Sequence, residues 1–170
     1  MKIGIIGPES TGKTTLARYL ADRYKGTYVP EYAREYVERK GSTHVTYDEL
    51  CAIAHHQIEE IQHLTGEIIV PLVGKETVCQ AKPVFFDTDL IVTKIWFDYA
   101  FGRVPEWLND AIRTYLMDFY LLTKPDIPWI PDPARENGSD TIRQELFDRY
   151  EAEIQALNIP YFVVEHDENP

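Results

Sequence analysis

The stretch GIIGPESTGKTTL, Gly4 to Leu16, determines the predicted fold of this 170-residue chain. From Gly7 to Thr14 it matches G-x-x-x-x-G-K-[ST], the pattern of a phosphate-binding loop, at every fixed position. Residues 2–6, before the loop, are an isoleucine-rich run typical of a buried strand. After the loop, apolar residues recur at helical spacing, at Leu16, Ala17, Leu20, Ala21 and Tyr24. The motif therefore lies in the strand–loop–helix context that it requires.

The fixed positions of this loop have chemical reasons. Glycine lets the backbone turn tightly, so that several N–H groups face one anion. The following helix adds unpaired N–H groups and the positive end of its dipole. The Lys13 side chain can reach the β- and γ-phosphates, and the Thr14 hydroxyl can bind Mg²⁺. The loop therefore predicts a site for a nucleoside triphosphate.

Composition limits the class of protein. A hydrophobic fraction of 44% over 170 residues fits one globular domain spanning residues 1–170. The sequence has no apolar run of the roughly 20 residues that a membrane span needs, and no secretory signal. Cys51 and Cys79 stand far apart and are expected to be reduced thiols in a cytoplasmic protein.

The net charge of the chain limits the partners that it can bind. The net charge is −11, from 28 acidic and 17 basic residues. This balance disfavours nucleic acid, because binding a phosphate backbone needs a basic surface. It leaves a small neutral or cationic substrate open, and it says nothing about oligomeric state.

The rest of the chain alternates strands and helices. Residues 66–82 have no clear period, and four prolines between Pro125 and Pro133 exclude regular structure there. Further strands are predicted at 26–30, 83–87, 118–122 and 161–164, and helices at 31–39, 46–66, 90–100, 105–115 and 140–157. The helix at 46–66 begins with a capping-box pattern, Thr46 to Glu49. Five strands with helical crossovers predict an α/β fold, a parallel sheet with helices on both faces.

Asp87 ends an apolar strand, at the edge where such sheets bind ligands, and Asp89 follows two residues later. A kinase or NTPase needs a carboxylate near its metal ion, so both are candidate metal ligands that could also touch the acceptor. The alternative for each is a strand-end aspartate that caps the helix beginning at Leu90.

Glu31 stands just past the second predicted strand, also at the ligand-binding edge. It could accept the proton of an acceptor hydroxyl as a general base, or be an ordinary first-turn glutamate favoured by the helix dipole. Arg34, one turn later, could hold a substrate or phosphate, or be solvated.

The segment at about 125–140, after the fourth predicted strand, has the character of a lid over ATP. Arg135, and Arg143 just beyond it, could place positive charge on the transferring phosphoryl group, or be exposed arginines paired with acidic residues. Trp129, beside this segment, is the aromatic residue favoured to stack on a flat base.

Three polar residues on one helix, His55, Glu59 and His63, suggest a metal site at first sight. Eight residues of helix rise about 12 Å, which is too far for all three to bind one ion. We therefore expect surface histidines.

Several segments together carry a family resemblance. The segments GPESTGKTTLARYLA, VPEYAREYV, FFDTDLIVTKIWF, DFYLLTKPDIPW and DPARENG resemble the ribosylnicotinamide kinase domain of NadR-type NAD-biosynthesis proteins. The similarity runs from the N-terminus to about residue 164. The phosphate loop identifies only the P-loop superfamily, whereas DTDL and PDIPW, at their spacing, are more specific.

The resemblance implies a kinase-like P-loop NTPase, a three-layer sandwich with strand order 2-3-1-4-5. The implied reaction transfers the γ-phosphoryl group of ATP to the 5′-hydroxyl of nicotinamide riboside, giving nicotinamide mononucleotide. Glu31 lies in the matching acceptor-side segment and Arg135 in the lid. ATP would lie on Gly7, Pro8, Glu9, Ser10, Thr11, Gly12, Lys13, Thr14 and Thr15, and Mg²⁺ on Thr14 with Asp87 or Asp89.

Three departures from the family pattern stand beside these expectations. The DNA-binding and adenylyltransferase parts of larger family members are absent, residues 66–82 are long, and a helix expected beside the adenine site does not follow the last strand. Whether Glu31 or Asp87 is the base stays open, as does the acceptor. A kinase of another nucleoside and a nucleotide-switched regulatory ATPase are the alternatives.

Overall fold

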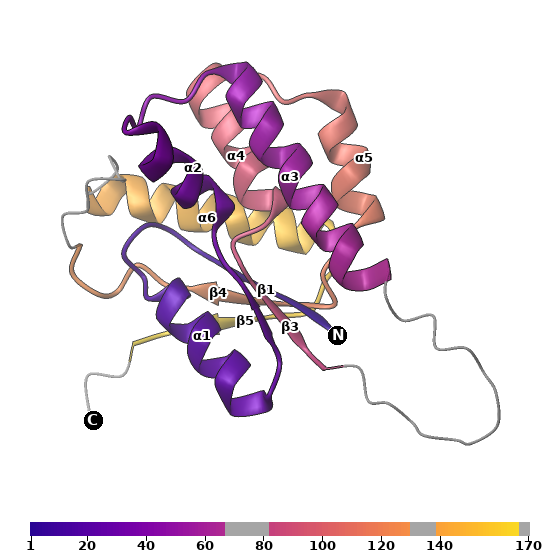
Figure 1. Cartoon of the computed structure of the whole chain (residues 1–170). Helices are drawn as coiled ribbons and strands as arrows, with labels where there is room; N and C mark the ends of the chain where they lie inside the picture. Colours follow the sequence, from indigo (N-terminus) through magenta and orange to yellow (C-terminus); the bar gives the residue numbers. More distant parts are fainter. Residues whose placement is uncertain (67–81, 130–138, 167–170) are drawn as a thin grey trace.

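The computed structural model describes residues 1–66, 82–129 and 139–166 (Figure 1). Within these ranges the chain forms five strands and six helices. In chain order they are β1 (Lys2–Ile6), α1 (Lys13–Tyr24), β2 (Thr27–Val29), α2 (Tyr32–Lys40), α3 (Tyr47–Gly66), β3 (Val84–Asp87), α4 (Leu90–Phe101), α5 (Glu106–Thr114), β4 (Phe119–Thr123), α6 (Asp140–Ala156) and β5 (Tyr161–Val164). The predicted elements are thus confirmed within one or two residues at each end.

The five strands form one parallel sheet in the order β2-β3-β1-β4-β5, which confirms the predicted order. Strand β1 lies in the centre, where Ile5 pairs with Asp87 of β3 and with Leu121 of β4. Because all strands run in the same direction, their carboxyl ends meet at one edge of the sheet. The loop after β1 and the aspartate at the end of β3 are therefore neighbours.

Helices cover the two faces unequally (Figure 1). On one face, α1 packs Ala17 and Ala21 against Ile3, Ile5 and Phe85 of the sheet. On the other face, α3, α4, α5 and α6 enclose a larger core with Ile6, Phe86 and Leu122. Burial of these apolar side chains on both faces explains why the strands read as near-continuous apolar runs.

Helix α2 differs from its neighbours, because none of its side chains is buried. It leans on α3 through ring contacts, and the Tyr32 ring stacks on His56 with centroids 3.5 Å apart. The helix ends at Gly41, whose left-handed backbone (φ 71°) accommodates the turn toward α3. This weakly packed helix stands beside the candidate site.

Two predicted features fall wholly or partly outside the described ranges. Residues 67–81, most of the segment without a clear period, are among them, and so is Arg135 of the predicted lid. The described part of the proline-rich segment, residues 124–129, has neither helix nor strand, as predicted. No helix in the described part of the chain is long and apolar enough to cross a membrane.

Candidate active site

The loop after β1 lies close to the end of β4. Gly7 has a φ of 152°, and a Cβ atom there would stand 2.5 Å from the backbone oxygen of Thr123. Thr11, also buried, places its hydroxyl 2.9 Å from Pro8 O and 2.6 Å from the Thr123 hydroxyl. Glycine at position 7 and the pair of threonines thus let the loop fold tightly onto the sheet.

Helix α1 begins at the end of this loop, and its N-terminus suits an anion. Gly12 caps the helix in a left-handed conformation without any side-chain hydrogen bond, and no acidic residue stands in the first turn. The first N–H groups of a helix lack partners within it and carry a partial positive charge. The buried Lys13 ammonium lies within the loop, donating to Pro8 O at 2.6 Å. This arrangement is what phosphate groups need.

Arg143 of α6 holds the phosphate loop through hydrogen bonds to its backbone. Its guanidinium is 1% exposed and donates to the backbone oxygens of Glu9 and Ser10 at 3.2 and 3.3 Å, and of Ile127 at 2.9 Å. It also forms an ion pair with Asp140 at 3.3 Å. The sequence suggested that this arginine touches phosphate or pairs at the surface. The structure instead buries it, with its donors on loop carbonyls.

Asp87 meets the phosphate loop at its first helical turn. The Thr14 hydroxyl donates to Asp87 Oδ2 at 2.6 Å, and the Tyr28 hydroxyl lies 3.4 Å from the same oxygen. Burial, and next the charge of Asp87, raise the pKa of Tyr28. The other carboxylate oxygen, Oδ1, is buried and has no hydrogen-bond partner among the described residues.

The donor set at this point fits a magnesium ion. Mg²⁺ prefers oxygen ligands and is usually held by one or two protein groups together with water and phosphate oxygens. Thr14 and Asp87 offer a hydroxyl and a carboxylate side by side, and Asp87 Oδ1 is a buried oxygen in need of a partner.

Asp89 has a different environment from the one that a metal ligand needs. Its Oδ1 accepts from the backbone N–H of Ile91 at 3.0 Å as the cap of α4, and its Oδ2 accepts from the Tyr120 hydroxyl. Burial raises the pKa of Asp89 to about 6, although these hydrogen bonds oppose the rise. Since protein donors occupy both oxygens, the capping alternative describes Asp89, and its predicted metal and substrate roles do not fit this geometry.

A cavity of about 380 Å³ begins at the phosphate loop and extends between α2, α3 and α4. Gly7, Glu9 and Lys13 of the phosphate loop line it, as do Glu31 and Thr88, which follow β2 and β3 in the chain. Apolar and aromatic side chains line much of the rest, among them Val37, Val45, Leu50, Ile53, Val92, Trp96, Tyr99, Ala100 and Phe101. A volume of this size holds a small organic molecule.

The cavity brings together some of the predicted acceptor residues and not others. Glu31, at the N-cap position of α2, and Arg34 both line it. Trp129 does not, although it was the aromatic residue favoured for base stacking. Trp96 of α4 lines the cavity instead, with Tyr99 edge-on to it at a centroid distance of 5.5 Å.

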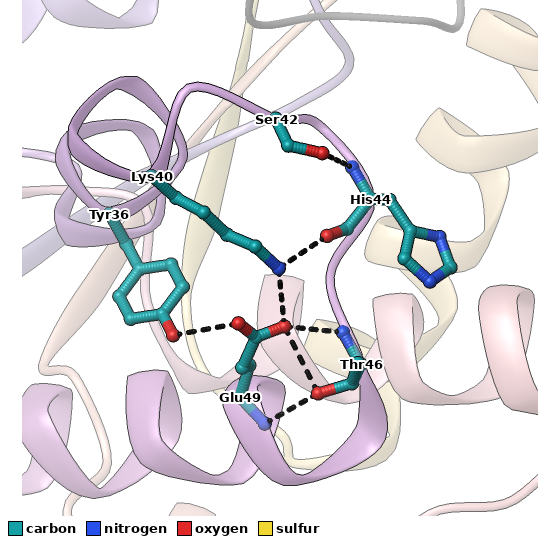
Figure 2. A network of polar contacts seen from close by, with 6 residues as sticks. All are labelled: Tyr36, Lys40, Ser42, His44, Thr46 and Glu49. Carbon is teal, nitrogen blue, oxygen red and sulfur yellow. Dashed lines mark hydrogen bonds and ion pairs between the residues drawn. The ribbon is translucent and has the colours of Figure 1, made fainter.

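The outer wall of the cavity is the connection between α2 and α3, which carries Thr43, His44 and Val45. Figure 2 shows the polar contacts that hold it. Lys40 donates to Glu49 Oε2 and to His44 O, both at 2.7 Å, and Tyr36 donates to Glu49 Oε1 at 3.1 Å. The His44 ring points away from these contacts. We call Tyr36, Lys40 and Glu49 the α2–α3 clamp.

The predicted capping box is part of the same network (Figure 2). Glu49 Oε2 accepts from the Thr46 backbone N–H at 2.8 Å, and the Thr46 hydroxyl accepts from the Glu49 backbone N–H at 3.3 Å. The hydrogen bond from Lys40, followed by that from Thr46, lowers the pKa of Glu49 to about 2. One carboxylate thus caps α3 and ties α2 to it.

The predicted surface positions of His55 and His63 are confirmed. His55, Glu59 and His63 are exposed, and His55 stacks on Trp107. No group of three or more metal-ligating side chains (His, Cys, Asp or Glu) occurs in residues 1–66, 82–129 and 139–166.

Sequence reasoning missed several residues of the site. Gln57 and Thr93 form a buried pair in the cavity wall, Tyr150 contributes from α6, and Thr123 contacts the loop from β4. Burial, and next the charge of Glu31, raise the pKa of Tyr150, so its hydroxyl stays neutral. The one available signal was a glutamine on the otherwise apolar side of α3, one turn after Ile53.

The chain is similar in sequence to several known proteins. A family model described as "AAA domain" matches residues 2–169. The chain is 28% identical over 166 residues to the trifunctional NAD biosynthesis/regulator protein NadR of Escherichia coli (strain K12), covering 98% of this chain and 38% of that protein. It is 30% identical over 142 residues to NadR of Salmonella typhimurium (strain LT2), covering 84% and 32%.

The chain is also similar to solved structures of NadR proteins and of a thymidylate kinase. A NadR protein in complex with NR has a TM-score of 0.72 at 22% identity, covering 99% of this chain and 44% of that one. A NadR protein in complex with NAD and AMP-PNP has a TM-score of 0.66 at 26% identity, covering 99% and 45%. Thymidylate kinase from Ehrlichia chaffeensis has a TM-score of 0.62 at 17% identity, covering 100% and 89%.

These comparisons confirm the predicted resemblance to NadR-type proteins and the predicted kinase-like P-loop fold. The chain spans less than half the length of the NadR proteins that it matches. The likeness therefore concerns one part of those proteins, and within this chain it covers both the phosphate loop and the cavity.

Proposed function

The chain belongs to the AAA domain family, and we propose that it transfers the γ-phosphoryl group of ATP to the 5′-hydroxyl of nicotinamide riboside, giving nicotinamide mononucleotide. The observation that carries this proposal is the cavity, because it joins the phosphate loop at Lys13 to an aromatic wall at Trp96. A nucleoside fits such a shape with its hydroxyl at the loop and its planar base among the aromatic side chains. Similarity to a NadR protein in complex with NR supports the choice of nucleoside.

The phosphate loop is proposed to hold ATP through its backbone amides, the α1 dipole and Lys13. Thr14 and Asp87 would hold Mg²⁺, since the two lie together and Asp87 Oδ1 has no partner among the described residues. Mg²⁺ held there would offset the negative charge of the phosphate groups. Arg143 contributes indirectly, because it fixes the loop carbonyls of Glu9 and Ser10.

The 5′-oxygen of the acceptor is proposed to attack the γ-phosphorus. The bond from that phosphorus to the β–γ bridging oxygen breaks, and ADP leaves with the electron pair. Glu31 is proposed as the base that receives the hydroxyl proton, because it lines the same cavity as Lys13, whereas Asp87 already accepts from Thr14. Arg34 would hold the acceptor beside it. A phosphate contact by Arg135 stays a prediction.

The test is incubation of the purified chain with Mg-ATP and a panel of nucleosides that includes nicotinamide riboside. Mass spectrometry then identifies any acceptor that has gained one phosphoryl group. We expect nicotinamide riboside to be phosphorylated and Lys13→Ala to abolish the transfer while the chain stays folded. Lys25→Ala, at an exposed lysine just past the end of α1, is the matched control and should retain activity.

Other results of this panel overturn the proposal in distinct ways. Phosphorylation of a different nucleoside alone would leave the mechanism and remove the named acceptor. ADP formation at a slow rate that no acceptor changes would instead indicate a nucleotide-switched regulatory ATPase. Transfer at the wild-type rate by Lys13→Ala would remove the mechanism itself.

A further inference from the structure

One buried polar pair lies in a wall of the cavity that is otherwise apolar or aromatic. Gln57 of α3 and Thr93 of α4 are 7% and 3% exposed, and both line the cavity. The other lining residues of these two helices are Leu50, Ile53, Val92, Trp96, Tyr99, Ala100 and Phe101. A buried amide in such surroundings needs a partner for each polar end, because an unmet donor costs free energy.

The pair fixes which end of the Gln57 amide faces the cavity. The Thr93 hydroxyl is 2.7 Å from Gln57 Oε1 and 3.4 Å from Asp89 O, so its proton goes to the glutamine oxygen. With Oε1 engaged, Nε2 is the end left to donate. No hydrogen bond joins Nε2 to another residue in the ranges 1–66, 82–129 and 139–166.

Gln57 lines the cavity in which the nucleoside is proposed to bind. It lines the main cavity with Glu31 and Trp96, and it also lines a small adjoining cavity with Asp87 and Thr88 at the end of β3. A planar base bound in the main cavity would therefore share that cavity with the amide donor. A carbonyl oxygen on that base would supply the hydrogen-bond acceptor that Nε2 lacks.

We propose that Gln57 is a specificity-determining residue whose Nε2 donates to a carbonyl oxygen on the planar base of the acceptor. Thr93 is a positioning residue, because its hydroxyl holds Oε1 and so turns Nε2 toward the base. This inference rests on the proposed function. The carboxamide of nicotinamide riboside carries such a carbonyl, whereas pyridine riboside has the same cationic ring and ribose without it.

The physical consequence is discrimination against bases that lack the carbonyl. A site built to hydrogen-bond one group rejects an analogue without that group strongly, since the buried donor is then unmet. Hydrophobic contacts alone discriminate far less. Removal of the donor should therefore abolish the preference, through loss of the reaction with the base that carries the carbonyl.

The experiment measures kcat/KM for nicotinamide riboside and pyridine riboside with the wild type and four variants. For the wild type we expect a preference of at least ~100-fold for the carboxamide. Gln57→Leu should reduce this preference below ~10-fold, through loss of the nicotinamide riboside reaction. Thr93→Val should give an intermediate preference, Thr93→Ser should restore it, and Gln62→Leu, at an exposed glutamine of the same helix, should not change it.

Three results with the Gln57→Leu variant overturn the inference alone. They are a Gln57→Leu variant that keeps the full preference, one that loses both reactions equally, and one that instead loses discrimination against a deoxyribose analogue. Melting curves check that each variant is folded. If Gln57→Leu does not fold, Gln57→Glu takes its place, because it keeps an oxygen for Thr93 and removes the Nε2 donor.

The wild-type reaction separates this inference from the proposed function. A wild type that phosphorylates no nucleoside overturns both. A wild type that phosphorylates only another nucleoside overturns the named acceptor, and the same variants are then compared on that nucleoside with and without its base carbonyl. A wild type active on nicotinamide riboside without any preference over pyridine riboside overturns the inference alone.

Discussion

The Thr14 hydroxyl and the Asp87 carboxylate are 2.6 Å apart, although 73 residues separate them in the chain. Helix α1 brings the hydroxyl to this point and strand β3 brings the carboxylate. Because Ile5 of β1 pairs with Asp87, the register of two neighbouring strands sets the distance between loop and carboxylate. The candidate magnesium site is therefore a product of sheet pairing.

Asp87→Asn should lower kcat by about 10²–10³-fold, because it removes the charge that would hold Mg²⁺ beside the transferring group. The affinity for ATP without metal should change little, and the Mg²⁺ dependence of nucleotide binding should weaken. Titration of nucleotide at several Mg²⁺ concentrations measures both. Asp118→Asn, at an exposed aspartate, serves as control, and a kcat within tenfold of wild type for Asp87→Asn would contradict the assignment.

Glu31→Gln should lower kcat by about 10²–10⁴-fold, the usual contribution of a general base. ATP binding should remain, since the role proposed for Glu31 concerns the acceptor hydroxyl and not ATP. Single-turnover rates with saturating acceptor measure the chemical step. Glu35→Gln, at an exposed glutamate of the same helix, should behave as wild type, and equal rates for the two variants would exclude Glu31 as base.

Arg143→Met should destabilise the fold by about 3 kcal/mol, because the backbone oxygens of Glu9, Ser10 and Ile127 lose a charged donor. The ion pair with Asp140 contributes little to this loss, because the Asp140 side chain is 93% exposed. Arg143→Lys should not restore stability, since one ammonium cannot reproduce the planar fork. Urea unfolding measures these changes, with Arg113→Met at the surface as control.

Glu49→Gln should weaken the α2–α3 clamp in a pH-dependent way. Hydrogen bonds from Lys40 and Thr46 lower the folded-state pKa of Glu49 from 4.5 to about 2, so its stabilisation is complete above pH 4.5 and is lost as pH falls toward 2. The wild type should therefore be more stable than Glu49→Gln at pH 7, and the difference should shrink between pH 4.5 and pH 2. Melting temperatures at pH 7, 4 and 3 test this.

Glutamine keeps the capping box, so the experiment isolates the charge. Glu59→Gln, at an exposed position of the same helix, controls for general surface effects. A pH-independent difference between wild type and Glu49→Gln would show that the ion pair with Lys40 contributes nothing.

Gly7→Ala should lower the free energy of unfolding by about 1–3 kcal/mol more than Gly41→Ala does. Both glycines have positive φ, but a Cβ at position 7 would meet the backbone oxygen of Thr123 at 2.5 Å, whereas nothing lies within 4 Å at position 41. Urea unfolding of the two variants gives the comparison. Equal losses would mean that the loop moves away from β4 without cost.

The fold was predictable because its signals are local. The sequence motif of the phosphate loop predicts the strand before it, β1, and the helix after it, α1. The capping box of Thr46 and Glu49 predicts the start of α3. Asp89 shows the limit of such reasoning. An aspartate after a strand fits a metal site and a helix cap equally well. Only the structure shows that the Ile91 N–H and the Tyr120 hydroxyl occupy both oxygens of Asp89.

The cavity was harder to predict, because its walls come from segments far apart in the chain. Helix α4 is apolar on nearly all sides, so its sequence does not tell which side faces a cavity, and Trp96 could not be separated from core residues. Arg143 acts on a loop more than 130 residues away. A basic side chain in an amphipathic helix is normally exposed to solvent, whereas Arg143 is buried and donates hydrogen bonds to the phosphate loop.

Helix α2, without a buried side chain, forms one wall of the cavity through Arg34 and Val37. Local stability follows buried apolar contacts, so we expect this helix to open before the sheet does. Its amide hydrogens should exchange with solvent through brief local openings, while those of β1 exchange only when the whole chain unfolds. An acceptor that contacts Arg34 and Val37 binds the ordered helix alone, and part of its binding free energy is consumed in ordering that wall. The affinity for the acceptor will therefore fall with rising temperature faster than the affinity for ATP.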